Sequence, residues 1–352
     1  MADWYLLAPD EDARALAQAA GAQFRSLNGP ADMRAAIDGA ALAPDGWATL
    51  VKGGYLDIGV PEALGGLGRM IDLVVMLEEA GRSLLTAPLL AAVLASQTQI
   101  AAGVHREELR QSPAGFATAE GTVEDGRCFV DRAHVFGGLD AAALTLIVKG
   151  PDRAWIAVVD PDTDGVELLE RATVIDPSRP VPALRLRGAA AVESRALALD
   201  DLERIMASAR ACLAADLVGT AAGALDAAIA HVLQRKQFGR AIGAFQAVKH
   251  QLADAYVSVE KARSLTFGAA LSLVPGVPDD IPTRDCLLAN AVAAEAAVQV
   301  AARFTQLMGA MGVTFEADCH LFLRRAHQSA GLLGAPDDLF MAAARIERRE
   351  AR

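Results

Sequence analysis

The sequence predicts an α+β chain in three parts, helical at both ends and rich in β-strands in the middle. Up to about residue 111, apolar residues recur at helical spacing, as in 70-MIDLVVMLEEAGRSLL-85. From Pro113 to about Ala198, short β-rich pieces alternate with turn clusters. From Asp201 the helical pattern returns in long segments. Helix, then sheet, then helix is the order of an α+β chain.

These zones predict three domains: an N-terminal α-helical domain over 1–112, a middle β domain over 113–200 and a C-terminal helical bundle over 201–352. The strand pieces expected in the middle are 143–148, 154–159 and 183–188. The helices expected in the last zone are 201–234, 245–274, 284–309 and 316–333, with a linker at 275–282. Small residues dominate 219-GTAAGALDAAIA-230, which favours a tight bundle and is also compatible with a subunit interface.

Composition excludes several classes of protein. The chain has 352 residues, 53% of them hydrophobic, with a net charge of −11, which argues against a nucleic-acid-binding protein. No run of 18 uncharged apolar residues occurs, so no membrane span is predicted. Acidic residues stand near the N-terminus where a signal peptide needs basic ones, which favours the cytoplasm. The cysteines lie far apart without metal or redox spacing, so buried, reduced thiols are expected: Cys128, Cys212, Cys286 and Cys319.

The stretch 233-LQRKQFGRAIGAFQAVKHQLAD-254 interrupts a helical pattern and restarts it at once. Arg235 offers a planar fork of donors suited to a phosphate, Phe238 offers a flat apolar face, and Gly239 can end a helix. Together these residues could grip a nucleotide. Taken alone, they favour an ordinary glycine-capped helix with a solvated arginine.

Three motifs in order resemble the acyl-CoA dehydrogenase family, and the resemblance covers nearly the whole chain. The first is 54-GYLDIGVPEALGGLG-68, followed by Glu-Glu-x-Gly-Arg at 78–82. The second is 235-RKQFGRAIGAFQAVKHQLAD-254. The third, 306-QLMGAMGVTFEADCHLFLRRA-326, resembles the family's Q-x-x-G-G-x-G-x-T-x-E segment, with Ala310 in place of the second glycine.

The resemblance implies a fold of an N-terminal helical domain, a β-barrel-like middle domain and a C-terminal four-helix bundle. It implies a flavoprotein that uses FAD to dehydrogenate the α and β carbons of an acyl-CoA thioester. A carboxylate takes the α proton, and the β hydrogen leaves as hydride to the flavin. An electron acceptor such as an electron-transfer flavoprotein is also expected. In this family each FAD lies between two subunits, and one of them reaches across to hold the ADP half.

The resemblance assigns that cross-subunit role to particular residues. Arg235 would pair with the pyrophosphate. The other residues expected to bind the cofactor lie beside the adenosine or let the backbone approach the dinucleotide: Gln237, Phe238, Ile242, Phe245, Gln246, Gln306, Gly309 and Gly312.

The chain's own flavin pocket departs from the family pattern. The loop that enters the β domain reads 116-FATAEGTVEDG-126 and lacks the family's Gly-Ser-Asp ending. Val135, Phe136 and Gly137 stand where the family presents Trp-Ile-Thr or Trp-Ile-Ser to the flavin.

The two places where the family carries its catalytic glutamate are Leu333 and Ala209, and neither side chain can transfer a proton. Other carboxylates are weaker candidates for the base: Glu316, Asp216, Glu120 and Glu203. His250 and His320 are expected to be surface or packing residues, and no set of side chains has the spacing of a metal site.

Three interpretations remain. In the first, the chain is the short β subunit of an α2β2 acyl-CoA dehydrogenase of the type that acts on steroid-CoA esters, and it completes the FAD site of a catalytic partner subunit. In the second, it is a homo-oligomeric acyl-CoA dehydrogenase with an unusual base such as Asp216. In the third, it is a flavin-free scaffold or CoA-binding protein. The acyl group is not predicted.

Overall fold

The computed structural model describes residues 9–27, 30–39, 45–105, 111–138, 141–170, 174–274 and 277–350. By its internal contacts the chain divides into two compact units, each assembled from separate stretches of sequence. Unit 1 comprises Met1–Asp38, Met70–Leu85 and Leu213–Arg352, and unit 2 comprises Gly39–Arg69 and Thr86–Cys212.

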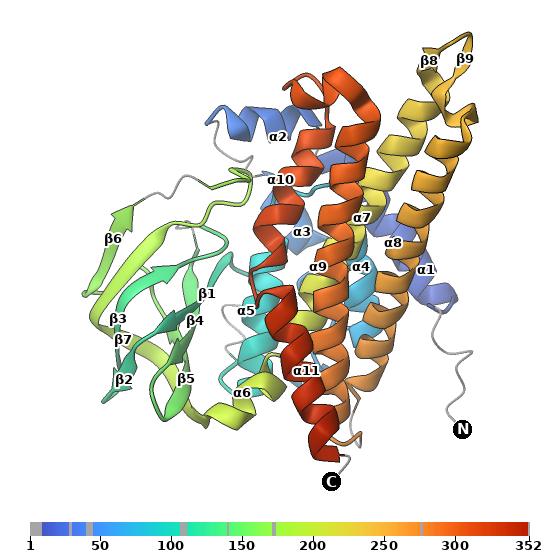
Figure 1. The fold of residues 1–352 in the computed structure, drawn as a ribbon. Helices are drawn as coiled ribbons and strands as arrows, with labels where there is room; N and C mark the ends of the chain where they lie inside the picture. Colours follow the sequence, from blue (N-terminus) through green and yellow to red (C-terminus); the bar gives the residue numbers. More distant parts are fainter. Residues whose placement is uncertain are drawn as a thin grey trace. The chain divides into compact units, whose positions relative to one another are not determined.

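Unit 1 is built from helices, and it carries one small hairpin. Its helices are α1 (Glu11–Leu27), α2 (Pro30–Ile37), α4 (Met70–Arg82), most of α7 (Ala207–Gln234), α8 (Gln246–Ser272), α9 (Asp280–Met308), α10 (Cys319–Ala330) and α11 (Pro336–Glu350). Helix α9 packs against α8, α10 and α11, and the β8–β9 hairpin projects from one end of the bundle (Figure 1).

Glycines bring α4 and α7 into backbone contact. A Cβ on Gly81 would lie 2.0 Å from the carbonyl oxygen of Asp216, and one on Gly219 would lie 1.9 Å from that of Glu78. Real Cβ atoms do not approach this closely, so only glycine fits at these two positions. This is the tight packing that the small residues of 219–230 predict.

The acidic and basic residues of 78–82 fasten α4 to its neighbours in unit 1. Arg263 of α8 donates to Glu78 at 2.9 Å, and Arg82 donates to Asp226 of α7 at 2.8 Å. Burial raises the pKa of Glu79, although Arg82 beside it acts in the opposite direction. The 78–82 motif therefore has a structural role in this unit.

Unit 2 contains the sheet, and its helices are α3 (Asp45–Lys52), α5 (Leu89–Ala102), α6 (Leu199–Ile205) and the 3₁₀ helix η2 (Glu62–Leu64). The strands are β1 (Ala114–Glu120), β2 (Thr122–Glu124), β3 (Arg127–His134), β4 (Ala143–Lys149), β5 (Arg153–Val159), β6 (Val166–Glu170) and β7 (Ala183–Ala198). Their order is β1-β4-β5-β7-β3-β2, with β6 paired to β7, and only β1 and β4 run parallel.

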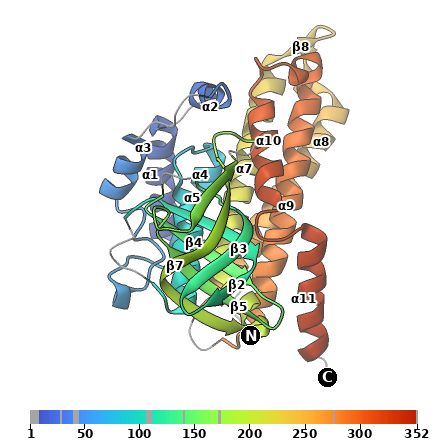
Figure 2. The same cartoon turned by 90° about the vertical axis from the view of Figure 1, so that its left-hand side faces the viewer.

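The sheet curves into a barrel-like form, which Figure 2 shows from the side. Phe116 of β1 and Phe136, just after β3, exchange backbone hydrogen bonds of 2.9 and 2.8 Å. This bridge joins the first strand to the segment that follows β3. Apolar side chains of Leu144, Leu146 and Leu184 fill the core beneath.

The predicted α+β architecture is confirmed, and several boundaries differ from the sequence expectation. The segment 116–126 is not a loop, because it forms most of β1 and all of β2. Helix α9 begins at Asp280, inside the expected linker 275–282, since Pro282 is tolerated in a first helical turn. Pro275 and Gly276 lie outside the described residues. Helix α11 was not predicted at all.

The buried cysteines are confirmed, since all four lie inside the protein and none is in a disulfide. Among the described residues, two segments are long and apolar enough to cross a membrane, Ala207–Gln234 and Asp280–Val313. Most of each apolar window is buried, 83% and 67% respectively. Core helices of a bundle pass the same test, so length and composition are a weak indication of a span.

Candidate functional site

The interruption after α7 is a two-stranded hairpin. Helix α7 ends at Gln234, and β8 (Lys236–Gln237) pairs with β9 (Arg240–Ala241). Phe238 and Gly239 form the turn with φ of 52° and 78°, the positive values that a type I′ turn requires at both central positions. The expectation that Gly239 ends a helix is therefore wrong, because the helix has already ended five residues earlier.

Phe238 is unfavourable for folding on two counts. A phenylalanine at positive φ carries backbone strain, and this one is also 91% exposed. Strained, exposed aromatic residues contribute little to a core, so the position is typical of a residue retained for contact with another molecule.

Phe245 connects the hairpin to the start of α8. Its ring meets the ring of Phe238 edge to face, with centroids 6.1 Å apart, and the Arg240 guanidinium lies 4.1 Å from the Phe245 centroid. Both separations are within the range of favourable aromatic and cation–π contacts. The hairpin side chains are thereby arranged before any ligand binds.

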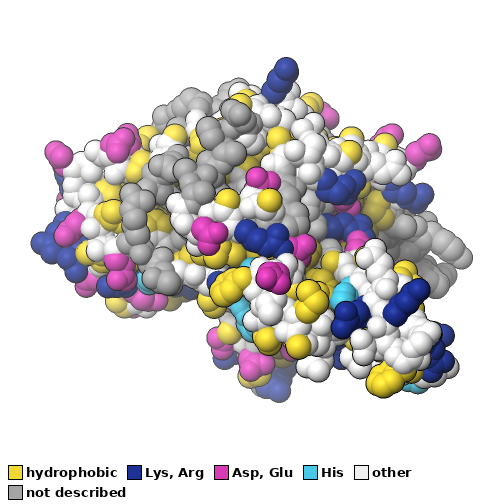
Figure 3. Space-filling model, turned by 90° about the horizontal axis from the view of Figure 1, so that it is seen from above, with side chains coloured by type: hydrophobic (Ala, Val, Ile, Leu, Met, Phe, Trp, Pro, Cys, Tyr) yellow, Lys and Arg dark blue, Asp and Glu magenta, His cyan; other side chains and the backbone are white. Residues whose placement is uncertain are grey.

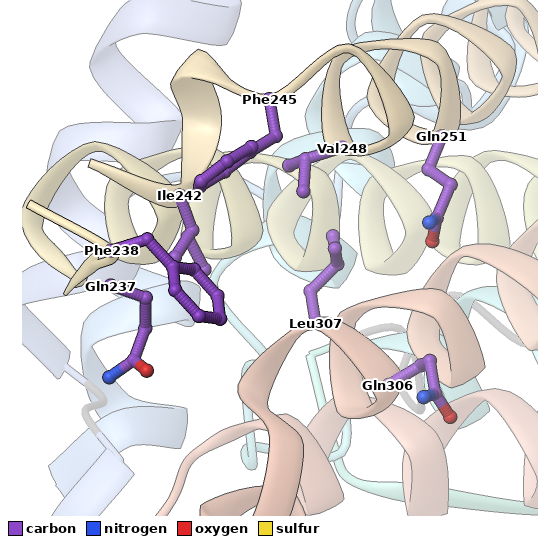
Figure 4. A pocket seen from close by; sticks show the side chains of 8 residues that line it. All are labelled: Gln237, Phe238, Ile242, Phe245, Val248, Gln251, Gln306 and Leu307. Carbon is purple, nitrogen blue, oxygen red and sulfur yellow. The ribbon is translucent and has the colours of Figure 1, made fainter. Parts of the chain in front are cut away.

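A shallow hollow of about 310 Å³ lies between this hairpin and the end of α9. Its lining residues are Gln237, Phe238, Ile242, Phe245, Val248, Gln251, Gln306 and Leu307. Figure 4 shows Leu307 of α9 pointing toward Val248 of α8. The walls are apolar, and three amide side chains supply donors and acceptors.

The charge around the hollow opposes that of the chain as a whole. Residues 227–253 contain no Asp or Glu, in a chain of net charge −11. The same stretch carries Arg235, Lys236, Arg240 and Lys249. Figure 3 shows Lys and Arg side chains beside hydrophobic ones at the hairpin end of the bundle, at the lower right of the view.

His231 lies one helical turn before Arg235. Burial lowers the pKa of His231, and the positive charge of Arg235 lowers it further. An anion bound at Arg235 would relieve the second effect, so this imidazole reports on the charge state of the site.

The structure brings together part of the predicted cofactor-binding set. Gln237, Phe238, Ile242, Phe245 and Gln306 line the hollow. Arg235 and Gln246 lie outside its lining and are exposed. Gly309 and Gly312 belong to the 3₁₀ helix η5 (Gly309–Val313), which follows α9 directly.

The two glycines differ in what surrounds them. Nothing would lie within 4 Å of a Cβ on Gly309, whereas a Cβ on Gly312 would meet the Thr305 carbonyl oxygen at 2.3 Å. Gly309 therefore leaves its backbone open to a ligand, and Gly312 allows the loop to fold onto α9.

Sequence reasoning missed Val248, Gln251 and Leu307 as lining residues. Val248 stands three residues after Phe245, so helical spacing on α8 could have identified it. Leu307 is adjacent to Gln306, but only the packing of α9 beside α8 brings it to the hollow.

The two positions that the resemblance assigns to the catalytic glutamate are apolar and buried. Ala209 is fully buried in α7, and Leu333 is buried in the turn between α10 and α11. Asp216 is fully buried on α7, and its backbone carbonyl oxygen faces Gly81 of α4. Asp216 is not among the residues that line the hollow. Ala209, Leu333 and Asp216 therefore supply no proton acceptor to the hollow.

The other candidate bases are also away from the hollow. Glu316 and Glu120 are exposed, and Glu203 pairs with Arg210 at 2.7 Å. His250 is exposed on α8, while Nε2 of His320 lies 3.3 Å from the Phe315 carbonyl oxygen. Among the residues that the structure describes, no group of three or more His, Cys, Asp or Glu could hold a metal.

The segment that follows β3 turns its side chains inward. Val135 is fully buried, Phe136 is 3% exposed, and the Arg179 guanidinium lies 5.8 Å from the Phe136 centroid. Gly137 has φ of 101°, and a Cβ there would meet Ala91 at 2.6 Å. Val135 belongs to the core of the sheet, and Phe136 is buried as well.

The arrangement around the hollow suits one class of ligand. An exposed ring, guanidinium groups and amide side chains can hold a molecule that has both a flat base and phosphates. The same hollow holds no acid or base among its lining residues, so it can bind and orient but cannot transfer a proton.

Comparison with known proteins agrees with the three motifs. The family profile "Acyl-CoA dehydrogenase, C-terminal domain" matches residues 200–336. The acyl-CoA dehydrogenase IpdE2 of Mycolicibacterium smegmatis is 30% identical over 332 residues, which cover 93% of this chain and 96% of that protein.

Two solved structures share the fold across nearly their whole length. The Tcur3481-Tcur3483 steroid ACAD G363A variant superposes with a TM-score of 0.83 at 26% identity, covering 97% of this chain and 99% of that one. The ChsE4-ChsE5 complex from Mycobacterium tuberculosis gives a TM-score of 0.81 at 23% identity, covering 98% and 99%. The identity to IpdE2 over almost the full length, with the matching fold, shows that the chain belongs to the acyl-CoA dehydrogenase family, FAD-using oxidoreductases that act on CH–CH bonds.

Proposed function

We propose that this chain is the non-catalytic partner of an α2β2 acyl-CoA dehydrogenase and that it completes the FAD site of a catalytic subunit. The single observation that carries the proposal is the hairpin end of unit 1. There a strained, 91% exposed Phe238 stands beside cationic side chains on an otherwise acidic chain. Such a surface is unfavourable for an isolated protein and fits a nucleotide held from a second chain.

The residues present fit the ADP half of FAD. The exposed Phe238 ring provides a stacking face for adenine, and the exposed Arg235 guanidinium provides donors for the pyrophosphate. Gly309 leaves open space where a side chain would otherwise stand, so its backbone can approach the dinucleotide. A hollow of about 310 Å³ accommodates part of a dinucleotide, which agrees with a site shared between chains.

The same chain is not equipped to act on the substrate by itself. FAD supplies the hydride acceptor for the dehydrogenation of the thioester. The α proton must be taken by a carboxylate. At the two positions that the resemblance assigns to this carboxylate, the chain has Leu333 and Ala209, and both are buried. In the proposed complex this chain therefore binds and orients the cofactor, while the catalytic partner takes the α proton.

The similar structures are compatible with a two-chain enzyme. One of them is named as a complex of two proteins, and another is named as a steroid ACAD with two components. We propose by analogy that the substrate is an acyl-CoA, in the class of steroid-CoA esters, and that the reduced complex passes electrons to an acceptor such as an electron-transfer flavoprotein. We place the complex in the cytoplasm.

The test is to express this chain alone and together with the longer acyl-CoA dehydrogenase chain expected from a neighbouring gene. The expected result is a colourless single chain and a yellow complex with FAD bound. Stoichiometric FAD in a homogeneous single-chain preparation would instead favour the homo-oligomer. A complex that assembles without any flavin would favour the scaffold.

A further inference from the structure

The segment between α9 and α10, residues 309–318, carries two of the glycines expected from the sequence at the cofactor site, Gly309 and Gly312, of which Gly309 is the open one. We call it the 309–318 loop. It is held against α9 at its middle, because Gly312 is buried and Sγ of Cys319 donates to the Gly312 carbonyl oxygen at 3.5 Å. Within the loop, Thr314 N donates to Met311 O at 3.0 Å.

The second half of the loop exposes apolar side chains instead of burying them. Val313 is 85% exposed and Phe315 is 67% exposed. An exposed apolar loop tends to collapse onto nearby apolar surface unless its backbone is held. The contacts that hold this backbone therefore decide where Gly309 and Gly312 stand.

One side chain from the start of the chain provides such contacts. Arg34 of α2 donates from Nη2 to the Glu316 carbonyl oxygen at 3.0 Å and from Nε to that of Phe315 at 3.4 Å. The same guanidinium pairs with the carboxylate of Asp318. A planar fork with several donors can hold two consecutive carbonyls and a carboxylate at once, which a lysine ammonium does less well.

The loop is also held from α10. His320 Nε2 lies 3.3 Å from the Phe315 carbonyl oxygen, and its ring lies 5.4 Å from the Phe315 ring. Arg324 lies 5.8 Å from the same ring. The pKa of His320 is lowered mainly by burial, and the charges of Arg324 and Arg34 lower it further. His320 thus lies close enough to Arg34 to sense its charge.

We propose that Arg34 is a positioning residue for the cofactor site. It acts through the backbone of Phe315 and Glu316, and it fixes the 309–318 loop so that Gly309 meets the nucleotide. This role in the site rests on the proposed function, whereas the contact between Arg34 and the loop does not. An exposed ion pair with Asp318 alone contributes little, so the two backbone carbonyls are the decisive contacts.

The first experiment measures the loop in the isolated chain. In hydrogen exchange, Arg34→Ala should speed exchange of the Thr314 amide about tenfold, while Asp318→Asn, which keeps both carbonyl contacts, should change it less than threefold. Arg34→Ala should also raise the pKa of His320, measured by NMR. The matched control is Arg14→Ala, since the Arg14 side chain donates to the nearby Pro9 carbonyl oxygen, far from the loop in sequence. Equal exchange in wild type and Arg34→Ala overturns the proposal.

The second experiment measures FAD release from the assembled complex. Arg34→Ala should speed FAD dissociation about three- to tenfold, with partial rescue by Arg34→Lys and no change in the KM for acyl-CoA. Faster loop exchange with unchanged FAD release would overturn the positioning role. The proposed function fails separately, if Arg235→Ala leaves FAD release unchanged, and the loop measurement still stands in that case.

Discussion

Two phenylalanines mark two contrasting regions of this chain. Phe238, at the hairpin of unit 1, is 91% exposed in a strained turn, whereas Phe136, after β3 in unit 2, is 3% exposed and bridged to a neighbouring strand. The hairpin holds Phe238 in an unfavourable backbone conformation and exposes its ring to solvent. The strand segment does the reverse and devotes its side chains to the core.

The contrast bears on the proposal that this chain holds another subunit's FAD and lacks a flavin pocket of its own. The hairpin proposed to hold another chain's nucleotide is arranged before any ligand binds, because Arg240 and Phe238 both contact the ring of Phe245. The segment that would face the chain's own flavin is occupied with packing. This difference supports the proposed division of labour between two chains.

The largest expected effect concerns turnover. Because Leu333 and Ala209 cannot accept a proton, the isolated chain should be at least about 10²–10⁴-fold less active than the complex. The measurement is acyl-CoA-dependent reduction of an artificial electron acceptor. Asp216→Asn in the complex should leave the rate unchanged. Turnover by the single chain that disappears in Asp216→Asn would identify Asp216 as the base and refute the division of labour.

The two phenylalanines can be compared directly by truncation. Phe136→Ala should lower the free energy of unfolding by about 3–5 kcal/mol, since it leaves a cavity where a large buried side chain stood. Phe238→Ala should change it by less than about 0.5 kcal/mol, as expected at an exposed position. Urea unfolding of the isolated chain measures both. Similar values for the two variants would show that the hairpin ring is a structural residue after all.

Arg235→Ala should weaken FAD binding in the complex about tenfold or more, because a charge-assisted phosphate contact contributes about 1.5–3 kcal/mol. The thermal midpoint of the isolated chain should stay unchanged, since Arg235 is exposed. The matched control is Arg345→Ala, because Arg345 is an exposed arginine on α11. If the Arg235→Ala complex keeps the same flavin content, the hairpin only connects two helices and does not bind FAD.

The smallest effect is electrostatic. Arg235 is one of two causes that lower the pKa of His231, so Arg235→Ala should raise that pKa while burial continues to depress it. NMR titration of the imidazole in the isolated chain measures the change, with Lys249→Ala as the control. Saturating ADP should raise the His231 pKa in wild type as well. A pKa that responds to neither change would place His231 outside the site.

The sequence predicted the architecture well wherever the pattern was local. Helical spacing located α7, α8 and α9, and β-rich runs located β4 and β5. Sequence analysis missed α11, because polar residues interrupt its apolar ones. Its apolar face, with Leu339 and Ala343, is recognised only from its packing against α9. Periodicity also could not reveal the hairpin, because two-residue strands are too short to show a pattern.

The candidate site divides in the same way. Phe238, Phe245 and Gln306 were predicted from motifs, and they line the hollow. Leu307 and the contact of Arg34 with the 309–318 loop could not be predicted, because they depend on residues far apart in sequence that meet only after folding.

Buried Arg325 has a further consequence for the order of assembly during synthesis. Its guanidinium donates to the Leu85 and Leu84 carbonyl oxygens at 3.2 and 3.3 Å, about 240 residues earlier in the chain, just beyond the end of α4. Unit 2 ends at Cys212, so all its segments leave the ribosome while much of the chain is still to be translated. Unit 1 joins distant segments of the sequence, so α4 emerges early but lacks its partners α7 and α8, which begin at Ala207 and Gln246, until those segments have been made. The nascent chain therefore exposes the apolar face of α4 until α7 and α8 have been made, and chaperones can act there during that interval.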